Sequence, residues 1–173
     1  SLKLPATIGT AGQVLKNSST AGTLEFGAAG KVLQVVTTTT QANHTSTSSS
    51  YQNVDELNTA ITPTASNSLL IAMLDVSLIR IYENNSHEAQ AFVSLSDDAG
   101  SSYLTVNALT GRDYGGSGIR IDWSYNLTHV KTAGSTSART YYLYMKLGQG
   151  DAYEFNPAVN ENFSTMSIWE IAQ

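Results

Sequence analysis

Two segments of the sequence combine amide, carboxylate and guanidinium groups with aromatic rings. Planar polar groups of this kind hydrogen-bond the hydroxyls of a sugar, while an aromatic ring covers the apolar face of a pyranose. The chemistry that these residue types suit is therefore the binding of a surface ligand such as a glycan. The candidate binding residues are Tyr82, Asn84, Asn85, His87, Arg112, Asp113, Tyr114, Trp123 and Tyr125.

A second interpretation assigns the same residues to the fold. Asn and Gly are common in turns, and the aromatic residues Trp123 and Tyr125 can alternate into the core or into a subunit interface. Functional residues concentrate in loops, which favours the first interpretation for the polar residues. The sequence leaves both interpretations open.

No motif in the sequence predicts catalysis. G-x-S-x-G, H-E-x-x-H and P-loop motifs are absent, so nucleophilic, metal-dependent and phosphate-transfer chemistry have no starting point. A glycoside hydrolase needs two carboxylates that flank the scissile bond. Glu83, Glu88, Asp113 and Asp122 are available, but their spacing selects no pair. We therefore expect a protein that is not an enzyme and uses no cofactor, with a capsule depolymerase as the enzymatic alternative.

Potential metal ligands are scattered along the sequence. His44, His87 and His129 lack the short spacing that places two imidazoles on one ion, although three-fold symmetry could gather copies of one His on an axis. Asp97 and Asp98 could offer oxygen ligands to Ca²⁺, but an adjacent pair followed by Gly and Ser is more typical of a hairpin turn. We predict no metal site.

The composition excludes several classes of partner. Charged residues make up 13% of the 173 residues, the formal net charge is −5, and no segment collects Lys or Arg. The electrostatic attraction that drives nucleic-acid binding is therefore missing. The chain has no Cys, which excludes disulfides and thiolate metal sites. The longest apolar run, residues 69–74, is far too short to cross a membrane, so we expect no membrane insertion.

From residue 31 onward, the apolar residues recur with a period of about two, which is typical of strands. Runs of β-branched and aromatic residues are bounded by Gly, Asn, Asp and Ser, and no stretch combines helical periodicity with a cap. We therefore predict an all-β protein that forms an antiparallel β-sandwich or jelly roll. The expected strands are residues 32–37, 49–54, 57–62, 68–82, 89–96, 103–108, 119–127, 139–147 and 165–171.

The sequence also indicates two regions and some of their contacts. Residues 1–30 are broken by Gly into pieces too short to form a core, so they are predicted to be a stalk or collar that precedes a β-sandwich domain of residues 31–173. Residues 69–74 are apolar on both faces and should be central in a sheet or lie at a subunit interface. The apolar strand at residues 165–171 should be paired, because an exposed edge of this kind invites aggregation.

Several segments resemble tail-fibre proteins of bacteriophages, particularly phages of marine bacteria. Leu4-Pro5-Ala6-Thr7-Ile8-Gly9-Thr10-Ala11-Gly12-Gln13-Val14-Leu15 and Gly22-Thr23-Leu24-Glu25-Phe26-Gly27 are similar to a segment of these fibres. Residues 30–36, 57–64 and 68–71 resemble the opening of a C-terminal β domain, and residues 136–143 and 166–172 resemble its closing strands. Phe26 stands where such proteins have Trp, and Trp169 where they have a smaller apolar residue. The middle of the chain, residues 82–131, matches no pattern of this family.

The resemblance implies a homotrimer of parallel chains about a three-fold axis, located in the virion, with a C-terminal domain that binds the host cell surface. The expected receptor is a host glycan or an outer-membrane protein. Because the chain begins at Ser1 without Met, we also expect missing upstream sequence through which other phage tail proteins attach. A trimer fits the stalk, since three copies could bury Val14, Leu15, Leu24 and Phe26 around a shared axis. The alternative is a structural or trimerisation module of the virion.

Overall fold

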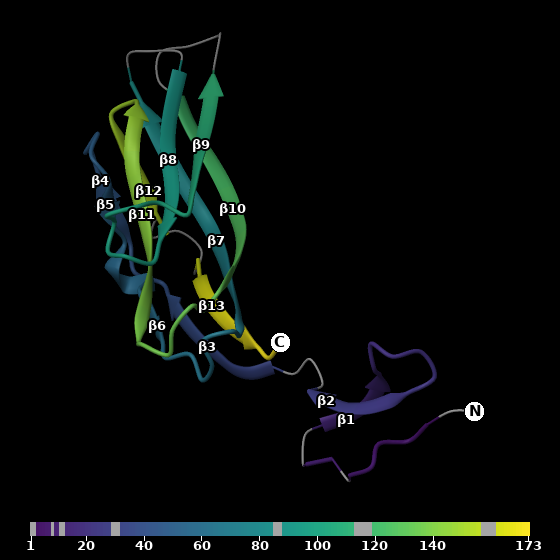
Figure 1. Cartoon of the computed structure of the whole chain (residues 1–173). Coiled ribbons are helices and arrows are strands. Elements are labelled where there is room, and N and C mark those ends of the chain that lie inside the picture. Colours follow the sequence, from purple (N-terminus) through teal and green to yellow (C-terminus); the bar gives the residue numbers. More distant parts are fainter. Residues whose placement is uncertain are drawn as a thin grey trace.

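The computed structural model describes residues 3–7, 9–10, 13–28, 32–84, 88–112, 119–156 and 162–173. These residues form strands and one short 3-10 turn, η1 (Asp55–Leu57). None of their helical residues makes a segment long and apolar enough to cross a membrane. The predicted fold class is confirmed: two antiparallel sheets pack face to face as a β-sandwich (Figure 1).

The large sheet is organised around one long strand, β7 (Leu69–Glu83). One edge of β7 pairs with β10 (Ile119–Thr132) over its whole length. The other edge is shared, because β13 (Ser164–Ile171) pairs with residues 69–75 and β12 (Ala152–Phe155) pairs with residues 79–82. The apolar run of residues 69–74 is therefore central, and the terminal strand is paired, both as predicted. Outside these lie β3 (Val32–Thr40), next to β13, and β4 (His44–Ser46), next to β12.

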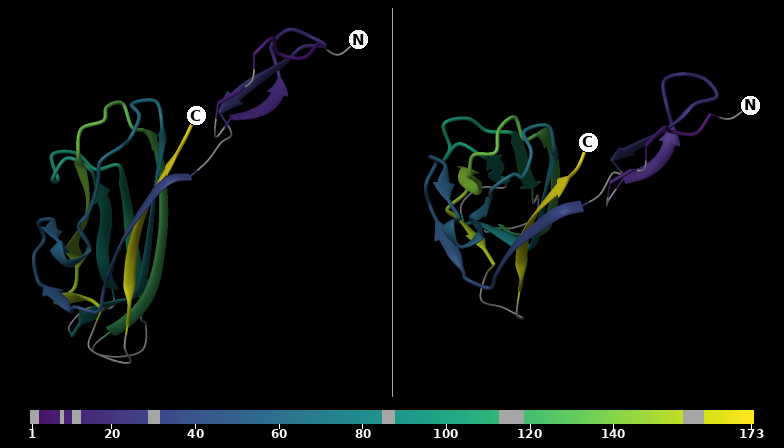
Figure 2. Two further views of the ribbon diagram at one scale, coloured as in Figure 1. Left: turned by 90° about the horizontal axis from the view of Figure 1, so that it is seen from below. Right: turned by 60° about the horizontal axis from the view of Figure 1, so that its bottom comes forward.

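The small sheet covers one face of the large one. Its order is β5 (Gln52–Asn53), β11 (Arg139–Gln149), β8 (Glu88–Ser96) and β9 (Thr105–Arg112), and β6 (Thr59–Ile61) also pairs with β11. A separate hairpin is made by β1 (Gln13–Asn17) and β2 (Leu24–Ala28). Figures 1 and 2 show this hairpin set apart from the sandwich, at the end where β13 finishes.

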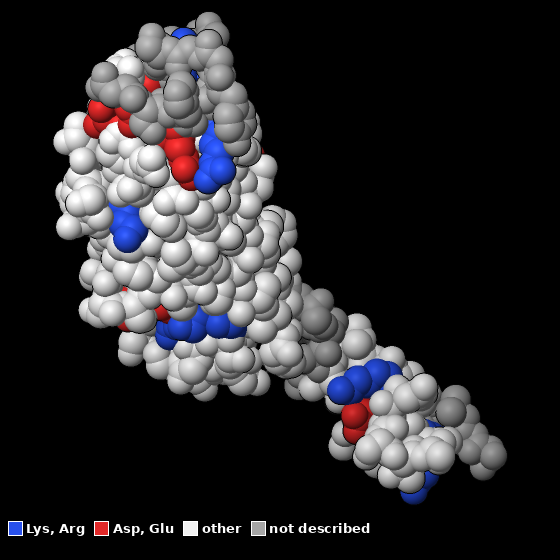
Figure 3. Space-filling view, turned by 90° about the horizontal axis from the view of Figure 1, so that it is seen from above, with Lys and Arg blue, Asp and Glu red and all other residues white. Residues whose placement is uncertain are grey.

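The core lies between the two sheets and is filled by alternate residues of each strand. On β7, Leu70, Ala72 and Leu74 are at most 3% exposed, whereas the residues between them face outward and are half-buried. Facing them from the small sheet are Ala91, Val93 and Leu95 of β8 and Tyr141, Leu143 and Met145 of β11. On the outside, charged side chains are sparse on the face drawn in Figure 3.

An irregularity in the pairing of β7 with β10 reverses the alternation along β7. Val76 is paired with Tyr125, but Ile79 is paired with Trp123, so β7 has one more residue than β10 in this interval. Ser124 Oγ donates a 2.9 Å hydrogen bond to the carbonyl of Ser77 there. Odd-numbered residues of β7 therefore face outward before the irregularity, and even-numbered residues face outward after it.

A buried carboxylate closes the end of the sandwich near the hairpin. Glu170 of β13 is fully buried, and its Oε1 accepts hydrogen bonds from Ser68 Oγ at 2.5 Å and from the backbone N–H of Thr64 at 2.8 Å. Its Oε2 accepts a bond from Gln34 Nε2 at 2.7 Å. Burial opposes ionisation, but these hydrogen bonds outweigh it and lower the pKa of Glu170 to about 2. The carboxylate thereby ties the segment before β7 to β3 and β13.

Replacing Glu170 by Gln should lower the free energy of unfolding by about 2 kcal/mol at neutral pH. Hydrogen bonds to a charged group contribute about 1.5–3 kcal/mol, and the amide of Gln would turn an N–H₂ group toward hydrogen-bond donors. The folded pKa lies below the unfolded value of 4.5, so this stabilisation is complete above pH 4.5 and is lost as the pH falls toward 2. Urea unfolding at fixed protein concentration measures both effects.

The matched control is Glu56→Gln, because Glu56 is an exposed carboxylate on η1. This control should leave stability at neutral pH unchanged. The Glu170→Gln variant and the parent should differ most at neutral pH and less in acid. Equal stability of the two at neutral pH would contradict the assigned role of Glu170.

Candidate functional site

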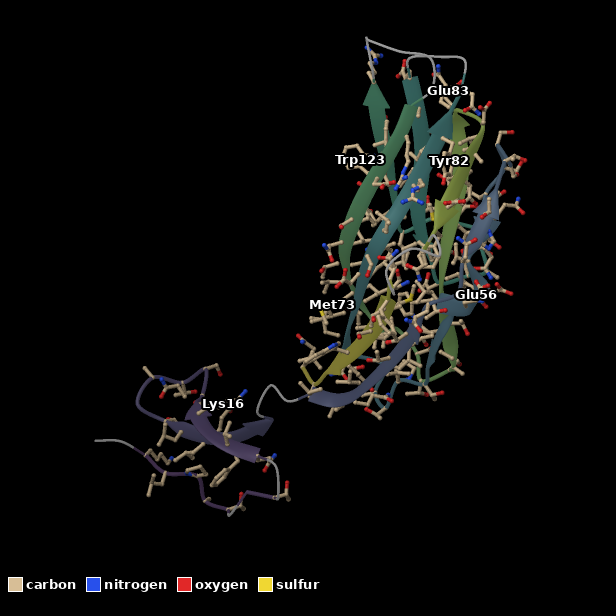
Figure 4. All side chains as sticks on the ribbon, turned by 180° about the vertical axis from the view of Figure 1, so that it is seen from behind. Lys16, Glu56, Met73, Tyr82, Glu83 and Trp123 are labelled. Atoms are coloured by element: carbon tan, nitrogen blue, oxygen red, sulfur yellow. The ribbon has the colours of Figure 1, made fainter. Side chains whose placement is uncertain are left out.

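The aromatic residues that the structure describes among the candidate binding residues lie on opposite faces of the large sheet. Trp123 and Tyr125 of β10 pack against the core, and the Tyr125 hydroxyl accepts a 2.7 Å hydrogen bond from Asn107 Nδ2. Tyr82 of β7 lies on the outer face of the same sheet, since its neighbour Ile81 faces the core (Figure 4). The interpretation in which Trp123 and Tyr125 alternate into the core is thus confirmed. Trp123 and Tyr125 therefore do not share a surface with Tyr82, because the sheet itself lies between.

The other candidate residues that the structure describes lie at strand ends. The backbone N–H and Nδ2 of Asn84 both donate to Asp151 Oδ2, at 2.9 and 2.6 Å. Arg112 Nη2 donates to both oxygens of Glu88 at 3.2 Å. These contacts lie within the protein and fix the ends of β7 and β9. The predicted residues Asn85, His87, Asp113 and Tyr114 lie outside the described residues.

Tyr82 belongs to a cluster of charged side chains on the outer face of β7, β10 and β12, which we call the charged cluster. Arg80 has a side chain only 5% exposed and binds Asp122 in a bidentate manner, with Nε–Oδ1 and Nη2–Oδ2 distances of 2.8 and 3.2 Å. Arg120 Nη2 binds Asp122 Oδ2 at 2.9 Å. Tyr82 Oη donates to Glu154 Oε2 at 3.0 Å, and Arg80 Nη1 lies 3.7 Å from the same oxygen.

Within the charged cluster, Asp122 is held as a carboxylate. The hydrogen bonds from Arg80 are the main cause that lowers the pKa of Asp122 to about 2, and the same contact raises the pKa of Arg80. A carboxyl group this acidic is ionised at neutral pH and cannot protonate a leaving group. The donors of Arg80 are directed at carboxylates of neighbouring strands, so the cluster joins β7 to β10 and β12.

Toward the hairpin, the same outer face of the large sheet is apolar. One row across four strands consists of Val35, Trp169, Ile71 and Val130, paired in that order. In this row Val35 is 46% exposed and Val130 is 50% exposed. Figure 4 shows the face from behind, with Met73 labelled. We define the apolar face as Val32 and Val35 of β3, Leu69, Ile71 and Met73 of β7, Val130 of β10, and Trp169 and Ile171 of β13.

The outer face of the small sheet is rich in aromatic rings. The ring centroids of Tyr51 and Tyr103 lie 4.4 Å apart, those of Tyr103 and Tyr144 lie 5.7 Å apart, and those of Tyr142 and Tyr144 lie 6.3 Å apart. Lys146 Nζ lies 4.8 Å from the ring centroid of Tyr51 and 4.9 Å from that of Phe92. All six side chains are half-buried. We define the aromatic surface as Tyr51, Phe92, Tyr103, Tyr142, Tyr144 and Lys146.

The sequence interpretation missed the aromatic surface, although part of its signal was present. Tyr142, Tyr144 and Lys146 recur at every second position of β11, opposite to the core residues Tyr141 and Leu143. A strand with two aromatic rings and a cation on its outward side is unusual for a solvated face. The remaining members come from segments far apart in the chain, so only the folded structure brings them together.

The structure also gathers three potential metal ligands that are separated in the sequence. Ligand atoms of His44 on β4 and of Asp55 and Glu56 on η1 all lie within 4.8 Å of one another. Both carboxylates are exposed, and exposed acidic groups are common without a bound ion. We therefore assign no metal to it.

The turn expected at Asp97 and Asp98 is confirmed. Asp98 accepts hydrogen bonds from Ser102, from Oγ at 2.5 Å and from N–H at 2.9 Å, and these bonds are the main reason that its pKa falls to about 2. Asp97 Oδ2 accepts a 2.6 Å hydrogen bond from Lys131 Nζ, with which it forms an ion pair. Both carboxylates are thus engaged by the protein itself.

Comparison with known proteins gives only distant likenesses. No family model matches the chain, and no curated protein matches it. Similar solved structures come from infectious bursal disease virus. The structure of the Gt strain has 12% sequence identity and a TM-score of 0.35, and the match covers 100% of this chain and 47% of that chain. The T13 viral particle has 9% identity and a TM-score of 0.31, with coverages of 93% and 44%, and the VP2 subviral particle has 11% identity and a TM-score of 0.29, with coverages of 92% and 45%. The chain spans less than half the length of these chains. Likenesses at this level carry no argument about function, and the fold is defined by the strand pairing described above.

Replacing Asp122 by Asn should destabilise the protein by about 1–3 kcal/mol, because the nearly buried Arg80 loses its bidentate partner while Glu154 remains nearby. The loss is smaller than for a fully buried pair, since the Asp122 side chain is 36% exposed. Urea unfolding at neutral pH tests this. The exposed Asp55→Asn change serves as control and should have no effect. Unchanged stability of the Asp122→Asn variant would show that the charged cluster is not structural.

Proposed function

We propose that this chain is a non-enzymatic attachment module, the tip of a bacteriophage tail fibre, which acts as a homotrimer and binds a glycan or an outer-membrane protein on the host surface. The segments that resemble tail-fibre proteins support this proposal. The observation on which it mainly depends is the contrast between the two outer faces of the sandwich. The apolar face on the large sheet suits self-association, and the aromatic surface on the small sheet suits a ligand.

The apolar face suits contact with further copies of the same chain. It is a continuous surface on four adjacent strands, and its members are uncharged. The next row along the sheet contains Thr37, Ser167 and Thr128 beside Met73, so the polar groups of this row are hydroxyls. Two of these hydroxyls, Thr37 Oγ1 and Ser167 Oγ, are hydrogen-bonded to each other at 2.9 Å. Surfaces of this composition associate by burying apolar area without leaving charges unpaired.

The hairpin and the segment before it also expose apolar side chains. Val14 and Leu15 on β1 are 45% and 47% exposed, and Leu4 is 65% exposed. Leu4, Leu15 and Phe26 line a shallow apolar pocket in the hairpin. The apolar face lies at the end of the sandwich from which the hairpin extends (Figure 2). Parallel chains around one axis would therefore bury the hairpin residues and the apolar face together.

The assignment of a binding role rather than a catalytic one is supported by one carboxylate. Asp122, one of the acids available for glycoside hydrolysis, is held ionised by Arg80 and Arg120. Weak individual sites suit an attachment module, because a trimer that engages one surface gains avidity by a factor of about 10² to 10⁴. A depolymerase would instead release new reducing ends from host capsule, which a colorimetric assay detects.

Replacing Val130 by Glu should dissociate the trimer, because it places a charge in the apolar face of every copy and burying an unpaired carboxylate costs several kcal/mol. Val130 is half exposed in the single chain, so the monomer should stay folded. Light scattering should give three times the 18.5 kDa chain mass for the parent and a single chain mass for the variant.

The matched control is Val106→Glu. Val106 is 54% exposed, but it lies on β9 in the small sheet, so the trimer mass should be kept. A folded parent protein with the mass of one chain at micromolar concentration would contradict the proposal of a homotrimer.

The attachment role is tested by binding of the labelled parent trimer to host bacteria and to their extracted surface polysaccharide. Retention on cells supports attachment, and the Val130→Glu variant should bind far less because it loses avidity. A trimer that binds neither cells nor extract would favour the structural alternative, in which the apolar face serves only to assemble and register the fibre.

A further inference from the structure

The aromatic surface contains a cation without a carboxylate partner. Lys146 Nζ lies over the rings of Tyr51 and Phe92, and no ion pair joins it to any Asp or Glu among the described residues. In contrast, Lys131 and Arg139 are both paired with Asp97. Contact with two ring faces holds the Lys146 ammonium group in place while leaving it able to bind an anion.

The rings around Lys146 offer free polar groups as well as apolar area. The hydroxyls of Tyr51, Tyr103, Tyr142 and Tyr144 make no hydrogen bond to any residue that the structure describes, and none of them is a buried polar atom. A phenol of this kind can donate to and accept from a ligand hydroxyl. Each ring is only partly buried, so part of its edge or face remains accessible.

The position of the rings is fixed before any ligand binds. Tyr142 and Tyr144 stand on β11, whose opposite side is in the core. The Tyr144 ring packs under Gly100, where a Cβ atom would lie 2.8 Å from Cζ, and the φ of Gly100 is +84°. Because little side-chain freedom is left to lose, less conformational entropy opposes binding.

We propose that the aromatic surface binds a saccharide chain that bears carboxylates, with Lys146 holding a carboxylate and the tyrosine rings covering adjacent pyranose faces. This inference rests on the proposed function and gives its ligand class. Asp98, whose charge acts on Tyr103 and Tyr144, accepts hydrogen bonds from Ser96 and Ser102 and forms no ion pair with Lys146. The chain as a whole has a net charge of −5, so attraction to an acidic polymer must be local to this surface.

The test is affinity electrophoresis of the full chain in gels that contain polygalacturonate, alginate or hyaluronan. Fully methyl-esterified polygalacturonate is the matched ligand control, because it keeps the sugar ring and loses the charge. The parent should be retarded by at least one acidic polymer and not by the ester. Lys146→Met, which keeps the alkyl chain, should weaken binding about tenfold or more, and Tyr51→Leu should weaken it through loss of ring contact.

Lys16→Met is the matched protein control, because Lys16 is 52% exposed on the separate hairpin, and it should bind like the parent. Light scattering and urea unfolding should show that all variants keep the assembly and stability of the parent. The inference is overturned if none of the three acidic polymers retards the parent, or if the ester retards the parent as strongly as the acidic polymer does. It is also overturned if the Lys146→Met variant is retarded as strongly as the parent. If that happens while the parent still forms trimers and binds cells, the proposed function stands. Retardation that depends on Lys146 in a monomeric protein would support the inference and contradict the trimer.

Discussion

The arrangement of the large sheet depends on the extra residue that β7 accommodates between Val76 and Ile79. Side chains alternate across a strand, so one additional residue exchanges the two faces for the rest of the strand. Because of it, Ile79 and Ile81 face the core and Arg80 faces outward. With unbroken alternation from Leu70, the guanidinium group of Arg80 would face the apolar interior and two Ile side chains would face water, which would cost several kcal/mol. The local irregularity therefore allows one 15-residue strand to serve both the apolar face and the charged cluster.

The few charged residues near the core are paired with one another or hydrogen-bonded by neutral groups. Charged residues are 13% of the chain, and those near the core are paired with one another: Arg80 with Asp122, and Lys131 and Arg139 with Asp97. Glu170 is satisfied by neutral donors alone. The apolar face accordingly has no charged member, and the aromatic surface has one, Lys146. Contacts made by the apolar face would rest on apolar area and hydroxyl groups, whereas contacts made by Lys146 would be screened by salt.

The sequence was sufficient to predict the long strands of the sandwich, because a two-residue period of apolar side chains follows directly from the geometry of a half-buried sheet. Each of the nine expected ranges contains at least part of a strand. The missed strands β4 and β12 have three and four residues, which is too short to show a period. The two strands of the hairpin were also missed, because they lie in residues 1–30, where frequent Gly residues predicted a stalk without regular strands. Side-chain direction was harder to predict, because Trp123 and Tyr125 look the same on either face until the register with β7 is known. The aromatic surface depends on contacts between distant segments, and no local pattern predicts these.

The two sides of β11 are under separate constraints. Its inward side chains, Tyr141, Leu143 and Met145, are fully buried and hold the sheets together, whereas Tyr142, Tyr144 and Lys146 meet water between them. Mutation can alter the second set without creating a cavity in the first. During divergence, the outward positions can therefore change in chemistry while the inward ones are retained, and a new surface needs no change in how the chain folds.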